Sequence, residues 1–400
     1  QNGGNRASGK PGHSASVDFV IKRAESFGDR LQVSVQGLEQ TIYYINNVKA
    51  SGKYAENVTI NSPQGNLPGT VTGDLTVTPG VMCSDSEWGG VNVNDKIALI
   101  VRGSCTAGVK IKGAASHGAK AVILYNNFSG EDYIFPTLGP GINVEDIVPT
   151  GIVSFETGTR WVGLLYGNTT LTLTLNVNAT WEKKTVNNVF VETSEGDANS
   201  IVMLGGHLDS VSAGPGINDD GSGVTALLEI MRGFAEHTGY KAKLRFAFWA
   251  AEEAGSVGST YYTDHLTLEE LAKIKIYFNY DMIGSLNPVY YVANNSIPEA
   301  WAAQELWSFI GVQGKTPVTY GPFDPQTDWA GFVARNVSVA GVHTGSSTTA
   351  DPCYHRSCDK FPGNINSEAL TVVAKAAARA AAWVALRVDE MPKSDGGVGV

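Results

Sequence analysis

From about residue 187 onward, short continuous apolar runs alternate with longer amphipathic segments. The apolar runs lie at residues 201–206, 244–249 and 274–280. They are typical of buried strands, because both of their faces are apolar. Residues 223–236 have helical apolar spacing, and the Ala-rich residues 367–387 are strong helix formers. Strands that alternate with helices predict an α/β fold, with a mostly parallel or mixed sheet covered by helices on both faces.

The stretch between about residues 55 and 181 has a different pattern, in which short β-rich pieces are separated by Gly and Pro turns. The pieces lie at residues 74–78, 96–102, 121–125 and 171–177. A helix-like segment at residues 106–117 lies between two of them. Near the start of the chain, residues 14–26 have helical spacing and residues 31–35 alternate as a strand does. With 400 residues, the chain has room for two or three domains.

Composition and charge exclude some partners. The chain is 42% hydrophobic and 17% charged, which is ordinary for a soluble globular protein. Its net charge of −10 argues against nucleic acid or an anionic membrane surface as a partner, because both attract basic patches. From the sequence pattern we expect no apolar run long enough to span a bilayer. We therefore expect neither a nucleic-acid nor a membrane partner.

Cysteines and glycosylation sequons indicate the compartment. The four cysteines fall into two local pairs, Cys83 with Cys105 and Cys353 with Cys358, where disulfides could close loops. Six Asn-x-Ser/Thr sequons occur, at Asn57, Asn127, Asn168, Asn178, Asn294 and Asn336. Together these features predict a secreted, extracellular glycoprotein. Because the chain starts at Gln1 with neither Met nor a signal-like segment, we expect a mature form.

Two imidazoles and four carboxylates lie where strand-like runs give way to loops. They are His207, Asp219, Glu252, Glu253, Asp281 and His355. His207, the Glu252–Glu253 pair and Asp281 each follow one of the three apolar runs, and reactive residues gather at the carboxyl ends of parallel strands. Neutral His and carboxylate oxygens suit Zn²⁺, and a set without Cys is typical of a catalytic site. The set suffices for two adjacent Zn²⁺ ions, with one carboxylate left to move protons.

Each fragment also has a simpler interpretation. The run Asn218-Asp-Asp-Gly-Ser is by itself most simply a turn followed by a helix N-cap. Cys353 and Cys358 could bind a metal together with His355 instead of forming a disulfide. His343 follows another strand and could line a pocket. The remaining histidines are expected at the surface or as helix caps; they are His13, His117, His237 and His265.

Taken together, the fragments form an ordered set that is similar to one protein family. The set is His207-x-Asp, Asn218-Asp-Asp-Gly-Ser-Gly, Glu252-Glu-x-Gly, Asp281-Met-Ile-Gly and Cys353-Tyr-His-x-x-Cys-Asp. It resembles the co-catalytic zinc aminopeptidases of peptidase family M28, in particular secreted fungal and bacterial leucine aminopeptidases. The resemblance covers residues 187–375 and the opening residues 5–12.

A second resemblance concerns the β-rich stretch. Val101-Arg-Gly-Ser-Cys and Gly113-Ala-Ala-Ser-His-Gly-Ala-Lys-Ala-Val-Ile-Leu-Tyr-Asn-Asn are similar to a protease-associated (PA) domain inserted into the peptidase. The implied domains are residues 1–52 for the first part of the peptidase, 53–185 for the insert, 186–391 for the catalytic part and 392–400 for a loose tail.

The family pattern implies a role for each matching residue. One Zn²⁺ would be bound by His207 and Asp281, the other by Glu253 and His355, with Asp219 bridging the two. Glu252 would be the general base, and Tyr354 would donate its phenol to the developing oxyanion. The peptide bond between Asp219 and Asp220 would be cis. Asp209 would accept a ring N–H from His207 or a neighbouring ligand and so fix its orientation.

The resemblance also implies how substrate is bound. Glu252 and Asp281 would anchor the free α-ammonium, so that only the N-terminal residue is removed. Met282 and Phe323 would contribute to an apolar pocket that favours Leu, Phe or Met. Where a bacterial relative has an arginine near the oxyanion site, this chain has Gln326, so an arginine contribution is in doubt.

The predicted function is therefore that of a monomeric, secreted, dinuclear zinc aminopeptidase acting on peptides or proteins with a free N-terminus. A carboxypeptidase or dipeptidase of the same fold would need a cationic clamp, which the Gln326 position does not supply. A glutaminyl cyclase would use a single zinc. A receptor-like ectodomain that has lost catalysis would have an incomplete ligand set, whereas this set is complete.

Overall fold

The computed structural model describes residues 2–63, 65–130, 136, 138–139, 142–294, 297–313, 317–321 and 327–392. The chain divides into two compact units. Unit 1 comprises Gln1–Gln40 and Thr185–Val400, and unit 2 comprises Thr41–Lys184. The strands β1 (Leu31–Ser51) and β6 (Thr172–Thr193) each continue from one unit into the other. Both are far longer than the strands predicted at residues 31–35 and 171–177, because polar residues continue the pairing where the apolar pattern fades.

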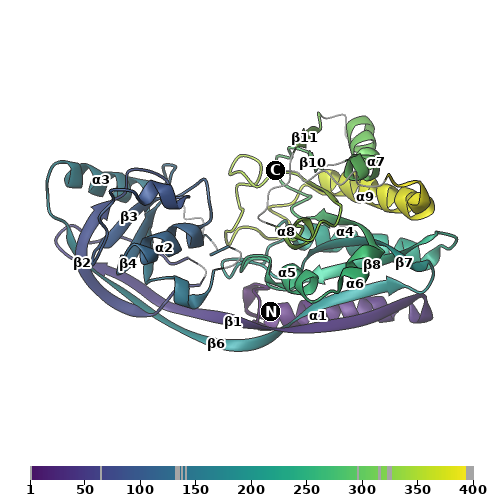
Figure 1. Cartoon of the computed structure of the whole chain (residues 1–400), viewed down its shortest axis with the longest axis horizontal. Coiled ribbons are helices and arrows are strands. Elements are labelled where there is room, and N and C mark those ends of the chain that lie inside the picture. Colours follow the sequence, from purple (N-terminus) through teal and green to yellow (C-terminus); the bar gives the residue numbers. More distant parts are fainter. Residues whose placement is uncertain are drawn as a thin grey trace. The chain divides into compact units, whose positions relative to one another are not determined.

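Unit 1 is a mixed sheet with helices on both faces (Figure 1), which is the predicted α/β class. Its strand order is β11-β10-β12-β9-β7-β8-β6. The strands are β7 (Asp197–His207), β8 (Ala242–Trp249), β9 (Ile274–Tyr280), β10 (Tyr291–Ala293), β11 (Thr319–Gly321) and β12 (Val339–His343). The central strands β12, β9, β7 and β8 are parallel to one another. Their carboxyl ends therefore meet at one edge of the sheet.

Two apolar cores cover the two faces of this sheet. The helices on one face are α1 (Pro11–Glu25), α4 (Gly221–Glu236), α7 (Ile297–Gln313) and α9 (Ser367–Arg387). Those on the other are α5 (Val257–Asp264), α6 (Leu268–Lys273) and α8 (Ala330–Ala334). Successive side chains of a strand point to opposite faces, so Phe278 belongs to the first core and Tyr277 to the second.

Helix α9 corrects one expectation from the sequence. With the residues that follow it, it is long and apolar enough to cross a membrane, judged by length and composition alone. In the fold, however, its Ala-rich face is buried against the sheet and against α7, with Ala376, Ala380 and Val384 fully covered. Its apolar composition is therefore explained by packing in the core of unit 1.

Unit 2 is a smaller sheet in the order β6-β2-β3-β4-β5. Its further elements are β2 (Gly69–Val77), β3 (Ile97–Val101), β4 (Ala121–Tyr125), β5 (Thr150–Val153), α2 (Ala107–Ser116) and α3 (Phe155–Tyr166). β2 is antiparallel to β6, and β2 to β5 are parallel. α2 and α3 pack on opposite faces, each over its own apolar core.

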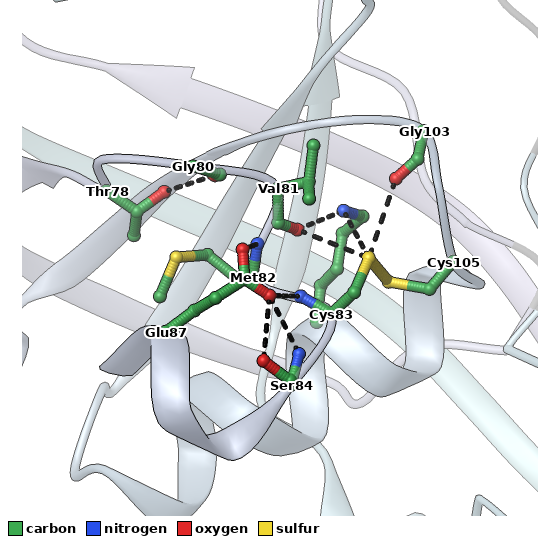
Figure 2. Close-up of a disulfide and its surroundings, with 10 residues drawn as sticks. Thr78, Gly80, Val81, Met82, Cys83, Ser84, Glu87, Gly103 and Cys105 are labelled. Carbon is green, nitrogen blue, oxygen red and sulfur yellow. Dashed lines mark hydrogen bonds between the residues drawn. A yellow bond between two sulfur atoms is a disulfide. The ribbon is translucent and has the colours of Figure 1, made fainter. Parts of the chain in front are cut away.

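A disulfide closes a loop of unit 2 by joining Cys83 to Cys105 (Figure 2). Next to it, the Glu87 carboxylate accepts hydrogen bonds from the main-chain N–H groups of Met82, Cys83 and Ser84, at 2.7 to 3.2 Å. The Lys110 amine donates to the carbonyl oxygen of Val81 and lies 3.7 Å from Cys83 Sγ. Burial lowers the pKa of Lys110 to about 8.

In unit 1, the Arg6 side chain ties the start of the chain to the loop between β7 and α4. Its guanidinium donates to the main-chain oxygens of Leu208 at 2.5 Å, Pro215 at 2.8 Å, Gly216 at 2.7 Å and Asp219 at 3.3 Å. A planar fork of five N–H donors can satisfy several carbonyls that point inward from one loop. Arg6 therefore fixes the loop that carries Asp219.

We predict that Arg6→Ala lowers the free energy of unfolding by about 2–4 kcal/mol, because it leaves several loop carbonyls without a donor. Arg6→Lys retains the charge but not the fork, so we expect it to recover only part of this loss. Urea unfolding followed by tryptophan fluorescence measures both. An unchanged urea midpoint for Arg6→Ala would contradict the anchoring role.

Candidate metal centre

The carboxyl edge of the unit 1 sheet carries the predicted site residues. His207 is the last residue of β7, Glu252 and Glu253 lie just beyond β8, and Asp281 directly follows β9. Asp219 precedes α4, and His355 lies in the loop between β12 and α9. Strands, loops and helix starts from distant parts of the sequence thus converge at one place.

The structure brings the five predicted ligands together as two groups of three. One group is His207, Asp219 and Asp281, and the other is Asp219, Glu253 and His355. Within each group the ligand atoms all lie within 4.8 Å of one another. Asp219 belongs to both groups, with Oδ1 3.0 Å from His207 Nε2 and Oδ2 3.1 Å from His355 Nε2. This geometry suits two neighbouring cations that share one carboxylate.

The remaining distances complete each group. Glu253 Oε2 lies 3.0 Å from His355 Nε2, and Asp281 Oδ1 lies 3.5 Å from His207 Nε2. Glu252 Oε2 is 3.9 Å from His207 Nε2 and belongs to neither group, although its side chain faces the same place. Glu252 is therefore positioned beside the ligands and not among them.

Buried atoms without hydrogen bonds support the presence of a cation at this site. Within the described residues, His207 Nε2, Glu253 Oε1 and Asp281 Oδ1 make no hydrogen bond although each is buried. Buried polar atoms without a partner are rare, and an ion is one of the usual reasons for them. Imidazole nitrogens and carboxylate oxygens are also the donor atoms that zinc prefers. The residues present thus fit a pair of zinc ions.

The pKa values of the site reflect burial and crowded charge. Burial raises the pKa of Glu253 to about 6 and that of Glu252 well above its ordinary value. Burial alone would lower the pKa of His207 and His355, but the surrounding carboxylates outweigh it and raise both. Burial would also raise the pKa of Asp219, but the two neighbouring imidazoles outweigh it and lower the pKa. The raised pKa values of the two imidazoles therefore reflect the negative charge that is crowded around them.

Asp209 supports the site, but differently from the prediction. Its carboxylate Oδ1 lies 3.8 Å from His207 Nδ1, too far for a hydrogen bond. It is the main-chain oxygen of Asp209 that faces His207 Nδ1, at 3.2 Å. The carboxylate instead accepts the N–H groups of Glu252 at 3.0 Å and Glu253 at 3.4 Å. Because Asp209 follows His207 by only two residues, its main chain faces the imidazole. Its carboxylate can therefore bind the loop that follows β8.

A buried polar network that the sequence did not reveal joins the loops of Asp219 and His355. Asn218 donates from its side chain to Asp351 Oδ2 at 2.7 Å and from its main chain to Asp359 Oδ1 at 3.0 Å. Asn364 bridges the same two carboxylates, at 2.7 and 2.9 Å. Asp359 Oδ2 also accepts the N–H of Asp219. Asn218 and Asp359 stand in the motifs quoted above, but the sequence does not show which groups their side chains meet, so the network is recognised only in the fold.

Asp220, next to Asp219, holds three elements together. The peptide bond between Asp219 and Asp220 is cis, as the family resemblance implies. The Asp220 carboxylate accepts the N–H groups of His207 at 3.1 Å, Gly223 at 2.9 Å and Met282 at 3.2 Å. It thereby links the end of β7, the start of α4 and the loop after β9.

The loop that carries His355 is closed by the second disulfide. Cys353 is bonded to Cys358, so neither cysteine is available to bind a metal. The Tyr354 ring packs on His355 with centroids 3.9 Å apart, and burial raises the pKa of its phenol well above the usual value. Met282 is buried beside the site, and its role in substrate binding stays a prediction. Phe323 and Gln326 lie outside the described residues.

The other histidines have structural surroundings. His117, His237 and His265 each lie at a helix end, with Nδ1 near the carbonyl oxygen four residues earlier. His343 packs on Tyr291, and its Nδ1 accepts the N–H of Gly345. The prediction for His13 was wrong, because this residue is buried in α1 and not at the surface; burial lowers its pKa.

Comparisons with known proteins agree with this site. The profile of Peptidase family M28 matches residues 188–381, and that of the PA domain matches residues 71–161. Aminopeptidase Y of Saccharomyces cerevisiae is 31% identical over 410 residues, which cover 98% of this chain and 75% of the yeast protein. The probable leucine aminopeptidase 2 of Aspergillus oryzae is 34% identical over 348 residues, covering 81% of this chain and 69% of the relative.

A solved structure extends this likeness to the fold. The aminopeptidase from Aneurinibacillus sp. strain AM-1 superimposes with a TM-score of 0.78 at 27% identity, covering 96% of this chain and 90% of that one. The match therefore includes both the catalytic part and the inserted part. From the site, the sequence relatives and the fold together, this chain belongs to peptidase family M28, the peptide-bond hydrolases, and carries an inserted PA domain.

Proposed function

We propose that this protein is a secreted aminopeptidase that holds two zinc ions and removes N-terminal residues, preferring large apolar ones such as Leu, from peptides and proteins. The observation that carries the proposal is the pair of three-residue groups that share Asp219. Relatives at 31% and 34% identity are named aminopeptidase and probable leucine aminopeptidase, which supports the same activity and preference here.

The two groups support an assignment of residues to each ion. His207 and Asp281 would bind one zinc, Glu253 and His355 the other, and Asp219 would bind both. Zinc at such a site supplies Lewis acidity, which polarises a carbonyl and acidifies water. The protein contributes the fixed positions of the ligands, because these five residues are held by the sheet edge and by the buried loop network described above.

Glu252 is proposed as the general base. It takes a proton from the attacking water and returns that proton to the departing amine. A carboxylate whose pKa is raised by burial can do both, because it holds a proton more readily than an exposed one. Ser256 Oγ donates to Glu252 Oε1 at 3.2 Å, and the Asp209 carboxylate accepts the main-chain N–H of Glu252. These two hydrogen bonds give the Glu252 side chain a defined position.

Tyr354 is proposed as the donor to the oxyanion that forms on the substrate carbonyl. A tyrosine phenol is protonated at neutral pH, burial raises its pKa further here, and a protonated phenol can donate a hydrogen bond to developing negative charge. Its ring rests on His355, which places it beside the second ligand group.

The restriction to N-terminal residues would come from the acidic groups of the site. Among the six site residues, Glu252 and Asp281 have the most exposed side chains, at 11% and 19%. They are therefore accessible to a substrate ammonium group. Met282, Phe323 and Gln326 remain the candidates for the specificity pocket.

A first test concerns the class of substrate. We expect leucyl-p-nitroanilide to be hydrolysed at least about 100-fold faster than its N-acetylated form, because acetylation removes the charge that the acidic groups bind. A zinc chelator should abolish the activity, and added Zn²⁺ should restore it. Cleavage of the acetylated substrate at a similar rate, or activity that survives chelation, would contradict the proposal.

A second test separates the two adjacent glutamates. Glu252→Gln should lower kcat by about 10²–10⁴-fold while the protein retains two zinc ions per chain, because the base is lost but no ligand is. Glu253→Gln is the matched control and should reduce zinc content. Zinc content is read by atomic absorption after dialysis. Loss of zinc from Glu252→Gln, with zinc retained by Glu253→Gln, would exchange the two roles.

If the protein is secreted, its exposed sequons should carry glycans. The asparagines at positions 57, 127, 168, 178 and 336 are exposed, whereas Asn294 Nδ2, the atom that would carry the glycan, is buried without a hydrogen bond to any described residue. Expressed in a eukaryotic secretory host, the protein should carry glycans at the exposed sequons and none at Asn294. Peptide mapping by mass spectrometry checks this, and a glycan on Asn294 would show that its side chain is accessible before folding is complete.

A further inference from the structure

Four side chains outside the ligand set form a continuous hydrogen-bond chain that ends on Asp281. Trp249 Nε1 donates to the Tyr277 hydroxyl at 2.8 Å, and this hydroxyl donates to Asn279 Oδ1 at 2.6 Å. Asn279 Nδ2 then donates to Thr327 Oγ1 at 3.2 Å, and Thr327 Oγ1 donates to Asp281 Oδ2 at 2.9 Å. Trp249, Tyr277 and Asn279 are almost completely buried.

The chemistry of the two ends fixes the direction of every bond in this chain. An indole N–H can only donate, and an ionised carboxylate can only accept. Each hydroxyl between them must therefore accept from one side and donate to the other. If the Asn279 amide were turned around, the Tyr277 hydroxyl would face two donors, and the Thr327 hydroxyl would face two acceptors with only one proton to donate. One arrangement of hydrogens satisfies all four bonds, so the Thr327 hydroxyl is directed at Asp281.

The sheet is built to accommodate this chain. Tyr277 and Asn279 are alternate residues of β9, and Asp281 continues the alternation directly after the strand, so the three side chains lie on the same side. Trp249 ends β8, which is separated from β9 by β7. On β7 the intervening residue is Gly205, and a Cβ there would lie 2.6 Å from the Tyr277 hydroxyl and 2.7 Å from Trp249 Nε1. The missing side chain leaves room for Trp249 to reach Tyr277 across the middle strand.

The two oxygens of Asp281 have separate surroundings. Oδ2 accepts from Thr327, whereas Oδ1 makes no hydrogen bond to the described residues and faces His207 Nε2. The Asp281 side chain is 19% exposed, more than those of His207, Asp219, Glu253 and His355. Packing therefore constrains the Asp281 side chain less than the other four, so a directed hydrogen bond has its largest effect on Asp281.

We propose that Trp249, Tyr277, Asn279 and Thr327 are positioning residues that hold the Asp281 carboxylate with Oδ1 towards the zinc shared with His207. The inference rests on the proposed function, because it assigns Asp281 as a ligand. It adds that the affinity of this one zinc position depends on a hydroxyl outside the ligand set.

The test is zinc binding by metal-free protein, titrated with Zn²⁺ against a chromophoric chelator. Thr327→Val removes the hydroxyl at nearly constant shape. We expect one of the two zinc ions to bind about 10–100-fold more weakly, as is common when an outer partner of a ligand is removed. Thr327→Ser retains the hydroxyl and should restore the wild-type affinity. Thr263→Val is the matched control, because it removes a hydroxyl that donates only to Thr260 O within α5.

The outcomes distinguish the two proposals. A wild-type protein that binds no zinc contradicts the proposed function itself. If the wild-type protein binds two ions and Thr327→Val binds both equally well, only the positioning role is overturned. The positioning role is also overturned if Thr327→Ser is as weak as Thr327→Val, because the hydroxyl would then not be the cause.

A double-mutant cycle tests whether the four residues act as a unit. Tyr277→Phe frees the Asn279 amide to turn, so it should weaken the same zinc position, by less than Thr327→Val does. The double variant should bind that zinc no more weakly than Thr327→Val alone, since the last link is already absent. Fully multiplicative effects of the two changes would contradict the relay.

Discussion

The concentration of carboxylates at a single buried edge of the sheet is the constraint on which the rest of the site depends. Asp219, Glu253 and Asp281, with Glu252 beside them, lie within a few ångströms of two imidazoles. Buried like charges are costly unless something opposite offsets them. Protons on the imidazoles can do this in the protein alone, and two divalent cations would do it more completely. The hydrogen bonds to the surrounding loops hold these carboxylates close together despite their repulsion.

Support for the ligands comes from the backbone at some positions and from side chains at others. Asp209, Asp220 and Asp359 accept main-chain N–H groups of site residues, so they fix the path of the loops. Arg6 performs the complementary task by donating to loop carbonyls. Asp281 follows its strand directly and is held through its side chain instead. The proposed ligands are therefore held by two kinds of contact, through the main chain at some positions and through the side chain at Asp281.

Much of this could be predicted from the sequence, because some signals are local. The apolar runs before His207, Glu252 and Asp281 predicted both the strands and the place where the ligands meet. The Ala-rich helix at residues 367–387 was predicted with the bounds observed. The long polar halves of β1 and β6 were missed, since their pairing and not their own apolar pattern makes them strands. Asn218, Asp359, Asn279 and Thr327 were missed because a polar residue gains its role only from partners brought together by folding.

Helices α1 and α9, which are far apart in the sequence, meet in one core, and this affects how the protein is made. Val17 and Val20 of α1 belong to the same buried cluster as Val373 and Val384 of α9. Unit 2 is continuous in sequence and has apolar cores of its own. During synthesis it can complete its packing as soon as it leaves the ribosome. The catalytic unit has to wait, with α1 already synthesised, until α9 emerges, so hydrolytic activity cannot arise before residues 367–387 have left the ribosome.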